Sequence, residues 1–372
     1  MSNHHPIIII GAGLSGLYLA WRLQQQQREV ILLEARERIG GRIASALINP
    51  PINDTTDNKI GLEVKVDLEM DLGPTWLWPE FQPRLQQLLK ALEVDTFRQY
   101  TRGKLLYEKT SQNIQPHAGP SSHQLSYRMA GGAGKLIRAL RKQLDDSSIY
   151  LNTAVTAINQ TSLNIQSSTE NSQRSFSADQ IILALPPRVA LQSITFQPTL
   201  EKTIAHLWED TPTWMATHCK IVFIYSTPFW REQHLSGEVF SHQGPLTEIY
   251  DASPADEHYF ALTSFVGLNA AQRKQLSRAQ LIEFCMLQLQ RLFGDHSQNV
   301  IDVHIKDWSN EPYTCSETDL NNNHRHPQYP DNMPRTLNNK NIILAGTEVA
   351  RENGGYLEGA LESADEALAL LS

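Results

Sequence analysis

The sequence has few cysteines and no long apolar run. Its three cysteines, Cys219, Cys285 and Cys315, lie far apart and form no Cys-x-x-Cys pair. This spacing argues against a disulfide framework and a zinc site and fits a reducing compartment, so we expect a cytoplasmic protein. No segment carries the ~18 consecutive apolar residues that a membrane-spanning helix needs. The short run at 7–10 leads directly into a glycine turn, so we interpret it as a strand and not as a secretion signal.

The chain also lacks an excess of positive charge. Its formal net charge is −8 and no basic stretch stands out, which argues against nucleic acid and anionic membranes as partners. Its thirteen histidines show no metal-ligand spacing, and no Ser-His-Asp or paired-carboxylate arrangement is evident. The composition, 41% hydrophobic and 19% charged, is that of a soluble globular protein. A chain of 372 residues is too long for one ordinary core, so we expect two interleaved or consecutive domains.

The N-terminus contains a complete strand–turn–helix–strand unit. The β-branched run at 7–10 predicts a buried strand, apolar residues at helical spacing predict a helix over 14–26, and 30–33 reads as the next strand. Gly11, Gly13 and Gly16 form a Gly-x-Gly-x-x-Gly turn at the junction that binds dinucleotide phosphates. Glu34 ends the second strand, where a carboxylate accepts hydrogen bonds from ribose hydroxyls. The pattern predicts a nucleotide with a free ribose and disfavours NADP.

The rest of the chain alternates between strand and helix patterns. Polar residues rich in Ser, His, Gly and Pro predict an exposed loop over 109–127, and residues 216–266 alternate in a strand-like way. We expect strands over 66–72, 149–152, 155–159, 181–185, 300–308 and 342–345, helices over 82–92, 135–144, 277–293 and 356–371, and a polar loop over 320–340.

Five ordered motifs beyond the fingerprint give the chain a family resemblance. They are Gly40-Gly41-Arg42, Asp71-Leu72-Gly73-Pro74-Thr75-Trp76 (with Pro74 in place of a glycine), Gly131-Gly132-Ala133-Gly134, Ala184-Leu185-Pro186-Pro187, and Ala345-Gly346-Thr347-Glu348 followed by Gly354-Gly355-Tyr356-Leu357-Glu358-Gly359-Ala360. This set resembles the flavin-containing amine oxidase family. The resemblance implies FAD as cofactor.

The resemblance also implies an α/β fold. We expect a Rossmann-like FAD-binding domain of the GR2 type with an interleaved α+β substrate domain built on a mixed sheet. The predicted FAD-binding domain is discontinuous and comprises residues 1–78, 128–213 and 309–372, and the substrate domain comprises 79–127 and 214–308. The family usually carries a helical insertion where this chain has only the 109–127 segment, so we expect a smaller roof and a more open cavity.

The implied cofactor contacts are spread over the whole chain. In this family Val155 would contact adenine through its backbone, and the helix that begins near Tyr356 would point at the side of the flavin where negative charge develops on reduction. The cofactor-binding residues implied by the resemblance are Gly11, Gly13, Leu14, Ser15, Gly16, Glu34, Ala35, Arg36, Gly41, Arg42, Gly73, Pro74, Thr75, Trp76, Val155, Trp308, Gly346, Thr347, Glu348, Gly355, Tyr356, Leu357 and Ala360.

Three residues are expected at the reaction centre. Lys220 matches the family lysine that holds a water at flavin N5, Tyr356 matches one of two rings that direct the amine, and Trp76 is a further candidate for the amine side. The alignment places the second ring at Thr318, which is not aromatic, so Trp76, Trp78 or Tyr313 would have to substitute, although core packing is the simpler reading of Tyr313.

The same alignment places the flavin-linking cysteine of mitochondrial monoamine oxidases at Glu317. Cys315 lies two residues away and so does not occupy the linking position. We therefore expect noncovalent FAD.

The expected substrate is a small-molecule amine. The segment after Gly73 contains no arginine to clamp a carboxylate, and Glu80 is the only nearby acid for a distal ammonium group. Trp76 and Trp78 instead favour an apolar or aromatic, primary or secondary amine, oxidised to an imine with O2 as acceptor and H2O2 as product. Two alternatives stay open: a dehydrogenase or desaturase of the same superfamily with another acceptor, and a flavin-binding protein without catalysis. We expect a monomer or homodimer.

Overall fold

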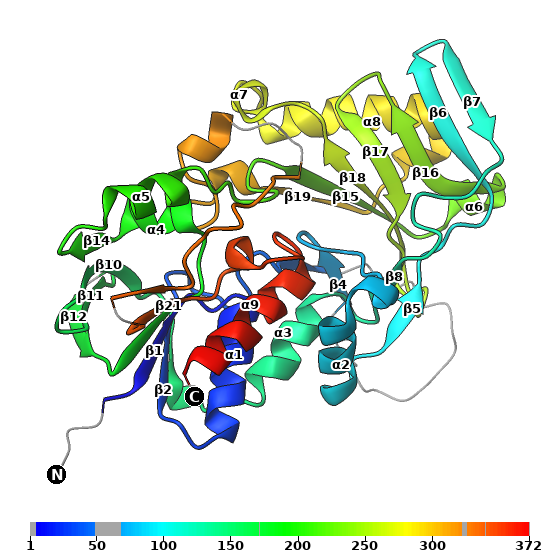
Figure 1. Ribbon diagram of the computed structural model, residues 1–372. Coiled ribbons are helices and arrows are strands. Elements are labelled where there is room, and N and C mark those ends of the chain that lie inside the picture. The colour runs from blue at the N-terminus through cyan, green and yellow to red at the C-terminus, as the bar shows by residue number, and fades with distance from the viewer. Residues whose placement is uncertain (1–4, 49–67, 171, 322–325, 339, 372) are drawn as a thin grey trace.

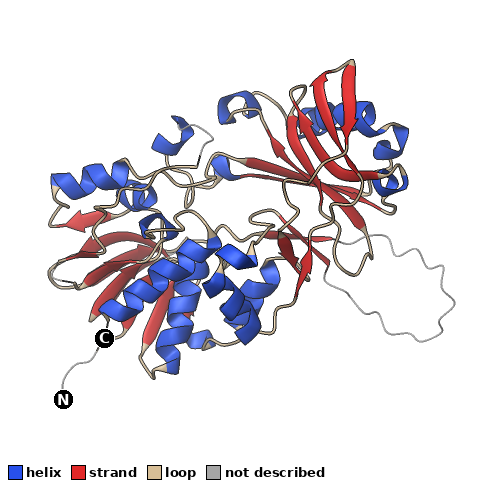
Figure 2. Cartoon of the chain, turned by 45° about the vertical axis from the view of Figure 1, so that its right-hand side comes forward, coloured by secondary structure: helices blue, strands red, loops and turns tan. Residues whose placement is uncertain are grey.

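Two large β-sheets organise the chain. The computed structural model describes residues 5–48, 68–170, 172–321, 326–338 and 340–371. One sheet contains six strands and the other seven, and Figure 2 shows them in separate parts of the molecule, each covered by helices. No helix within the described ranges is long and apolar enough to cross a membrane.

The six-stranded sheet is the nucleotide-type sheet predicted from the N-terminus. Its order is β20 (Thr336–Leu337), β21 (Ile342–Leu344), β13 (Gln180–Leu183), β1 (Ile7–Ile10), β2 (Val30–Leu33) and β9 (Ile149–Tyr150), with β1 parallel to both β13 and β2. Strands from the start, middle and end of the chain thus lie side by side. The predicted α/β class with a Rossmann-like domain is confirmed.

Residues along β1 alternate between two cores, as the two-residue period of a strand requires. Ile7 and Ile9 pack with helices α1 (Leu14–Gln25), α2 (Pro83–Ala91), α3 (Gly134–Arg141) and α9 (Leu357–Leu370). Ile8 and Ile10 pack on the other side, against β10 (Ala154–Asn159), β11 (Asn164–Ser168) and the Trp208 region of α5 (Lys202–Glu209). Figure 1 shows α1 and α9 next to each other over the sheet. Both faces are therefore buried, which explains the uninterrupted apolar runs in the sequence.

The seven-stranded sheet is mainly antiparallel. Its order is β19 (Asp302–Asp307), β15 (Cys219–Tyr225), β18 (Phe260–Val266), β17 (Leu246–Asp251), β16 (Leu235–Ser241), β6 (Lys104–Thr110) and β7 (Asn113–His117). Helix α8 (Arg278–Phe293) covers one face with α6 (Phe229–Glu232), and its N-terminus is closed by a capping box between Ser277 and Gln280. Strand β15 is buried along its whole length, so the strand-like alternation expected over 216–266 does not hold there.

The prediction of an exposed loop over 109–127 is wrong for residues 109–110, 113–117 and 127, which lie in strands. Strands β6 and β7 form a hairpin at the far edge of the seven-stranded sheet (Figure 1), and only residues 118–126 connect β7 to β8 (Tyr127–Met129) without a strand. Most side chains of β7 are exposed, so the hairpin lacks the apolar alternation by which strands are recognised.

The remaining elements are short. They are β3 (Ser45–Ile48), β4 (Leu68–Asp71), β5 (Thr96–Arg98), β12 (Gln173–Ser177), β14 (Thr195–Gln197), α4 (Pro187–Ser193), α7 (Ala270–Arg273) and the 3-10 turns η1 (Pro79–Phe81), η2 (Asp146–Ser148), η3 (Asp295–Gln298), η4 (Trp308–Asn310), η5 (Thr318–Asn321) and η6 (Thr347–Val349). Residues 66–67 of the strand predicted over 66–72 lie outside the described residues. The division into an FAD-binding and a substrate domain stays a prediction.

Candidate active site

One cavity of about 750 Å³ receives side chains from both sheets. Its lining contains nearly all the residues that the sequence predicted to bind the cofactor or to take part in the reaction, including Lys220, Trp76 and Tyr356. Gly16 and Glu348 are the two predicted residues absent from the lining. The other predicted residues on the cavity wall are Gly11, Gly13, Leu14, Ser15, Glu34, Ala35, Arg36, Gly41, Arg42, Gly73, Pro74, Thr75, Val155, Trp308, Gly346, Thr347, Gly355, Leu357 and Ala360.

The structure requires glycine at the three fingerprint positions for different reasons. A Cβ on Gly11, whose φ is +104°, would lie 2.5 Å from the carbonyl oxygen of Ala184, and one on Gly16 would lie 2.0 Å from that of Gly11. Both glycines therefore allow the turn, strand and helix to pack closely. Around Gly13 no described atom lies within 4 Å of an added Cβ, and Gly13 faces the cavity. This open backbone at the start of α1 fits a pyrophosphate group.

The ribose end of the cavity is arranged around Glu34. Its Oε2 accepts a hydrogen bond from the backbone N–H of Ala12 at 2.8 Å, and its Oε1 accepts one from that of Arg36 at 3.0 Å. Arg36 is fixed in turn, since its Nε pairs with Glu311 at 3.1 Å and its guanidinium lies 5.4 Å from the ring centre of Tyr313. The interpretation of Tyr313 as core is wrong, because this ring lies on the cavity wall and is only partly buried. The arrangement fits an adenosine.

The Gly40-Gly41-Arg42 segment lies directly beside the fingerprint turn. The N–H of Gly40 donates to the carbonyl of Ala12 at 2.8 Å, which brings Arg42 to the cavity wall. Arg42 pairs with Glu348 at 2.7 Å, and Glu348 is fully buried behind it. One carboxylate oxygen of Glu348, Oε2, has no hydrogen-bond partner among the described residues. Glu348 therefore supports the arginine instead of lining the cavity itself.

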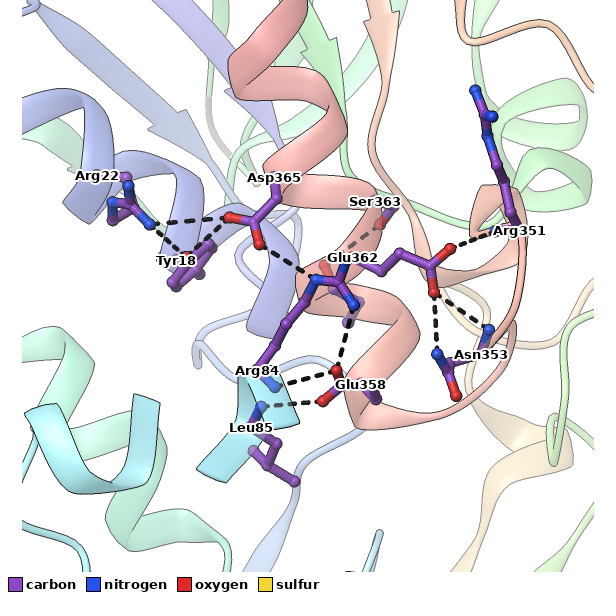
Figure 3. A network of polar contacts seen from close by, with 11 residues as sticks. Tyr18, Arg22, Arg84, Leu85, Arg351, Asn353, Glu358, Glu362, Ser363 and Asp365 are labelled. Carbon is purple, nitrogen blue, oxygen red and sulfur yellow. Dashed lines mark hydrogen bonds and ion pairs between the residues drawn. The ribbon is translucent and has the colours of Figure 1, made fainter. Parts of the chain in front are cut away.

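Helix α9 presents its N-terminus to the cavity and is held there by its own acidic residues (Figure 3). Glu358 accepts hydrogen bonds from the backbone N–H groups of Arg84, at 3.1 Å, and Leu85, at 2.9 Å, and thus caps helix α2. One turn later, Glu362 accepts hydrogen bonds from the N–H groups of Arg351 and Asn353 at 2.7 and 3.2 Å. The start of α9, the start of α2 and the loop before Gly354 therefore form one rigid unit.

Lys220 reaches the cavity from β15 and is only 3% exposed. Its Nζ donates to the carbonyl of Gly73 at 2.9 Å and to the hydroxyl of Thr75, and it lies 5.7 Å from the ring centre of Trp76. Burial lowers the pKa of Lys220 to about 7, although the nearby Asp71 acts in the opposite direction. The amine thus changes charge near neutral pH inside the cavity.

Aromatic side chains line the part of the cavity beyond Lys220. Trp76 meets Tyr250 of β17 edge-on at 5.0 Å, and its ring centre lies 6.4 Å from that of Phe265 of β18. The indole N–H of Trp76 donates to Gln99 at 2.9 Å, which fixes the plane of the ring. This wall accepts apolar and aromatic groups.

Tyr356 is 44% exposed and also lines the cavity. Its ring stacks on His326 with centres 4.9 Å apart and an angle of 12°. Trp214 covers the backbone beside it, since a Cβ on Gly355 would lie 2.9 Å from that of Trp214. Of the predicted ring positions, Thr318 is exposed and does not line the cavity, whereas Trp76, Trp78 and Tyr313 do.

Sequence reasoning missed several side chains of the amine side. Trp214, His218, Glu248, Tyr250 and Phe265 all line the cavity. Glu80 was the only acid considered there, but it is exposed and outside the lining, and Glu248 is the acid that reaches the cavity. The alternation of Glu248 and Tyr250 on one strand was the only signal, because these residues belong to no motif.

Comparisons with known proteins agree with this geometry. A family model described as flavin containing amine oxidoreductase matches residues 113–367, and one described as NAD(P)-binding Rossmann-like domain matches residues 9–92. The chain belongs to the flavin-containing amine oxidoreductase family. It is accordingly a flavin-dependent enzyme of amine oxidation.

The curated relatives are distant but align over most of their length. A probable flavin-containing monoamine oxidase A of Dictyostelium discoideum is 22% identical, and the match covers 98% of this chain and 96% of the relative. The flavin-containing amine oxidase B of Canis lupus familiaris is 26% identical over 99% of this chain and 86% of the relative. The first alignment spans 472 positions, so that relative carries segments that this chain of 372 residues lacks.

Solved structures share the fold. A putrescine oxidase bound to putrescine superposes with a TM-score of 0.80 at 19% identity, with 99% of each chain covered. The cyclohexylamine oxidase of Brevibacterium oxydans superposes with a TM-score of 0.79 at 17% identity, also over 99% of each chain.

Proposed function

We propose that the protein binds FAD noncovalently and oxidises an apolar or aromatic amine to an imine, with O2 as electron acceptor and H2O2 as product. The observation that carries this proposal is the position of Lys220. Its buried amine lies in the same cavity as the dinucleotide fingerprint, between Gly73 and the aromatic wall that begins at Trp76.

The residues of this chain have separate tasks in the proposed reaction. When bound, the flavin supplies a hydride acceptor for the amine α-carbon and passes two electrons on to O2. Trp76 and Tyr250 exclude water from the amine side and orient an apolar substituent. Lys220 holds a proton at Nζ, where its positive charge stabilises an anionic oxygen species that forms beside it.

Noncovalent attachment is supported by the three cysteines. All are free and buried, and Cys219, Cys285 and Cys315 are all missing from the cavity lining. Burial raises the pKa of each thiol to about 12, which makes them unreactive. Precipitation with acid is expected to leave a colourless pellet and a yellow supernatant. A yellow pellet would contradict noncovalent binding.

A panel of amines tests the reaction itself. Under anaerobic conditions, aryl-alkylamines are expected to bleach the flavin absorbance, and addition of air should restore it with one H2O2 per amine. The panel should include diamines and amino acids, since faster bleaching by these would contradict the proposed substrate class.

The same experiment separates the two alternatives. Bleaching by an amine followed by very slow recovery in air, together with rapid recovery on a quinone, would favour a dehydrogenase with another acceptor. Absence of bleaching by every amine, with normal photoreduction, would favour a flavin-binding protein without catalysis. The buried Lys220 favours the oxidase. A cytoplasmic location and a monomeric or homodimeric state stay predictions.

A further inference from the structure

The short segment 118–126 carries one aromatic side chain, His123, to the cavity wall. The segment is anchored on both sides of this residue. The N–H and hydroxyl of Ser122 donate to Oε1 of Glu238 at 3.1 and 2.6 Å, and the hydroxyl of Ser126 donates to the carbonyl of His123 at 2.9 Å. Glu238 belongs to β16 and is only 4% exposed, so the anchor is part of the sheet. His123 therefore has a defined position.

The imidazole of His123 lies among three larger rings. Its centre is 4.3 Å from that of Trp76 and 5.7 Å from that of Trp78, with an angle of 31° to each. Tyr250 meets it nearly perpendicularly at 4.7 Å. These separations are those of packed aromatic pairs, so His123 occupies a place that an aryl group of a ligand would fill equally well.

The indole of Trp76 is held in place independently of His123. The indole of Trp76 is held by Gln99, which is 7% exposed and donates in turn to the carbonyl of Asp251 at 2.7 Å. The backbone N–H of Trp78 donates to Gln82 at 2.8 Å. Removal of the imidazole should leave a slot bordered by the fixed indole of Trp76 on one side and by Trp78, whose backbone is held by Gln82, on the other.

The imidazole is uncharged at neutral pH. Burial lowers the pKa of His123 to about 4, and the attraction of Glu238 only partly opposes this. The ring therefore fills this space without carrying a charge, and it does not repel an ammonium group.

We propose that His123 is the residue that limits substrate size: the imidazole closes the aromatic slot between Trp76 and Trp78 and restricts the enzyme to amines with a single ring. The inference rests on the proposed function, because it assumes that the amine lies between Lys220 and this slot. In this proposal the segment 118–126 serves as a roof over the substrate.

The test compares a one-ring with a two-ring substrate. The ratio of kcat/KM for biphenylmethylamine to that for benzylamine is expected to rise about tenfold in His123→Ala, since one stacked ring contributes roughly that factor. His123→Phe keeps a ring in the slot and should retain the wild-type ratio. Gln124→Ala, at an exposed neighbouring position, is the matched control.

A binding measurement separates this inference from the proposed function. Biphenylmethanol and benzyl alcohol lack the amine, and their Kd values follow from quenching of tryptophan fluorescence. His123→Ala should bind biphenylmethanol about tenfold more tightly and leave the Kd of benzyl alcohol nearly unchanged. An unchanged ratio of Kd values in a variant of wild-type Tm would overturn the role of His123. If the ratio changes but no amine is oxidised, the proposed function fails and the role of His123 stands.

Discussion

The two ends of the cavity are built differently. At the fingerprint end, the wall is mainly backbone: Gly11, Gly13 and Gly41 bring main chain to the surface, and Glu34 and Arg42 are fixed by nearby groups. At the amine end, the wall consists of side chains from β15, β17, β18 and the segment 118–126. A wall made of main chain has a shape fixed by the fold and admits one cofactor in one pose. A wall made of side chains changes shape when a residue is substituted, so it can come to accept a different ligand. Substitutions at the two ends should accordingly have different consequences.

The largest effect is expected at the backbone end. Gly13→Val should weaken flavin binding by on the order of 100-fold or more, because the added side chain fills the space that phosphate needs at the start of α1. Folding should be retained, since no described atom lies within 4 Å of the added Cβ. Retained flavin per protein and the far-ultraviolet CD spectrum measure the two effects.

Gly119→Val is the matched control for this change. Its added Cβ also has no described atom within 4 Å, but Gly119 is exposed and lies outside the cavity lining. It should keep the flavin. Full flavin content in Gly13→Val would show that the turn is not a phosphate cradle.

Lys220 tests the junction between the two ends. Lys220→Met should slow reoxidation of the reduced flavin by O2 about 100-fold, because the positive charge is lost, and leave reduction by the amine within a few-fold. Stopped-flow measurement of the two half-reactions separates these rates. Equal slowing of both would assign Lys220 to the amine instead of to oxygen.

The same lysine predicts a pH dependence. The amine is cationic below its pKa of about 7 and neutral above it. Reoxidation should therefore be faster at pH 6 than at pH 8, by up to about tenfold, as the cationic fraction falls with rising pH. Lys220→Met should remove this dependence. A rate that increases with pH in the wild type would contradict the assignment.

Glu358 connects the start of α9 to the start of α2. Glu358→Ala leaves the N–H groups of Arg84 and Leu85 without their carboxylate and should lower the free energy of unfolding by about 3 kcal/mol. Asp365→Ala, on the same helix but with a side chain 37% exposed, should cost less than about 1 kcal/mol. Urea unfolding of the flavin-loaded proteins measures both. Equal losses would show that the cap of α2 adds little.

The smallest effect is expected within the aromatic wall. Trp76→Phe keeps a ring but loses the hydrogen bond to Gln99, and KM for an aryl-alkylamine should rise about fivefold with little change in kcat. Gln99→Leu removes the acceptor and should shift KM in the same direction. A large loss of kcat in either variant would mean that Trp76 takes part in the chemistry and not only in positioning.

The success of the sequence predictions differs in the same way between the two ends. The glycine turn, Glu34 and Gly40-Gly41-Arg42 were recognisable because phosphate and ribose contacts require particular residues at fixed spacings. Lys220 was recognisable only through the family resemblance. The strands of the β6–β7 hairpin were missed, because their side chains carry no apolar alternation, and so were Trp214 and Glu248, whose neighbours in sequence give no indication of a cavity.

The sequence by itself determined the cofactor class and the family, because a dinucleotide is bound by local backbone geometry that a short motif encodes. Only the tertiary structure decided where the amine side lies and what closes it. Trp76, His123 and strand β17, which carries Glu248 and Tyr250, are far apart in the chain, and β17 meets the segment 118–126 only when the seven-stranded sheet forms. Contacts between distant segments depend on the register of that sheet, and no single segment encodes that register.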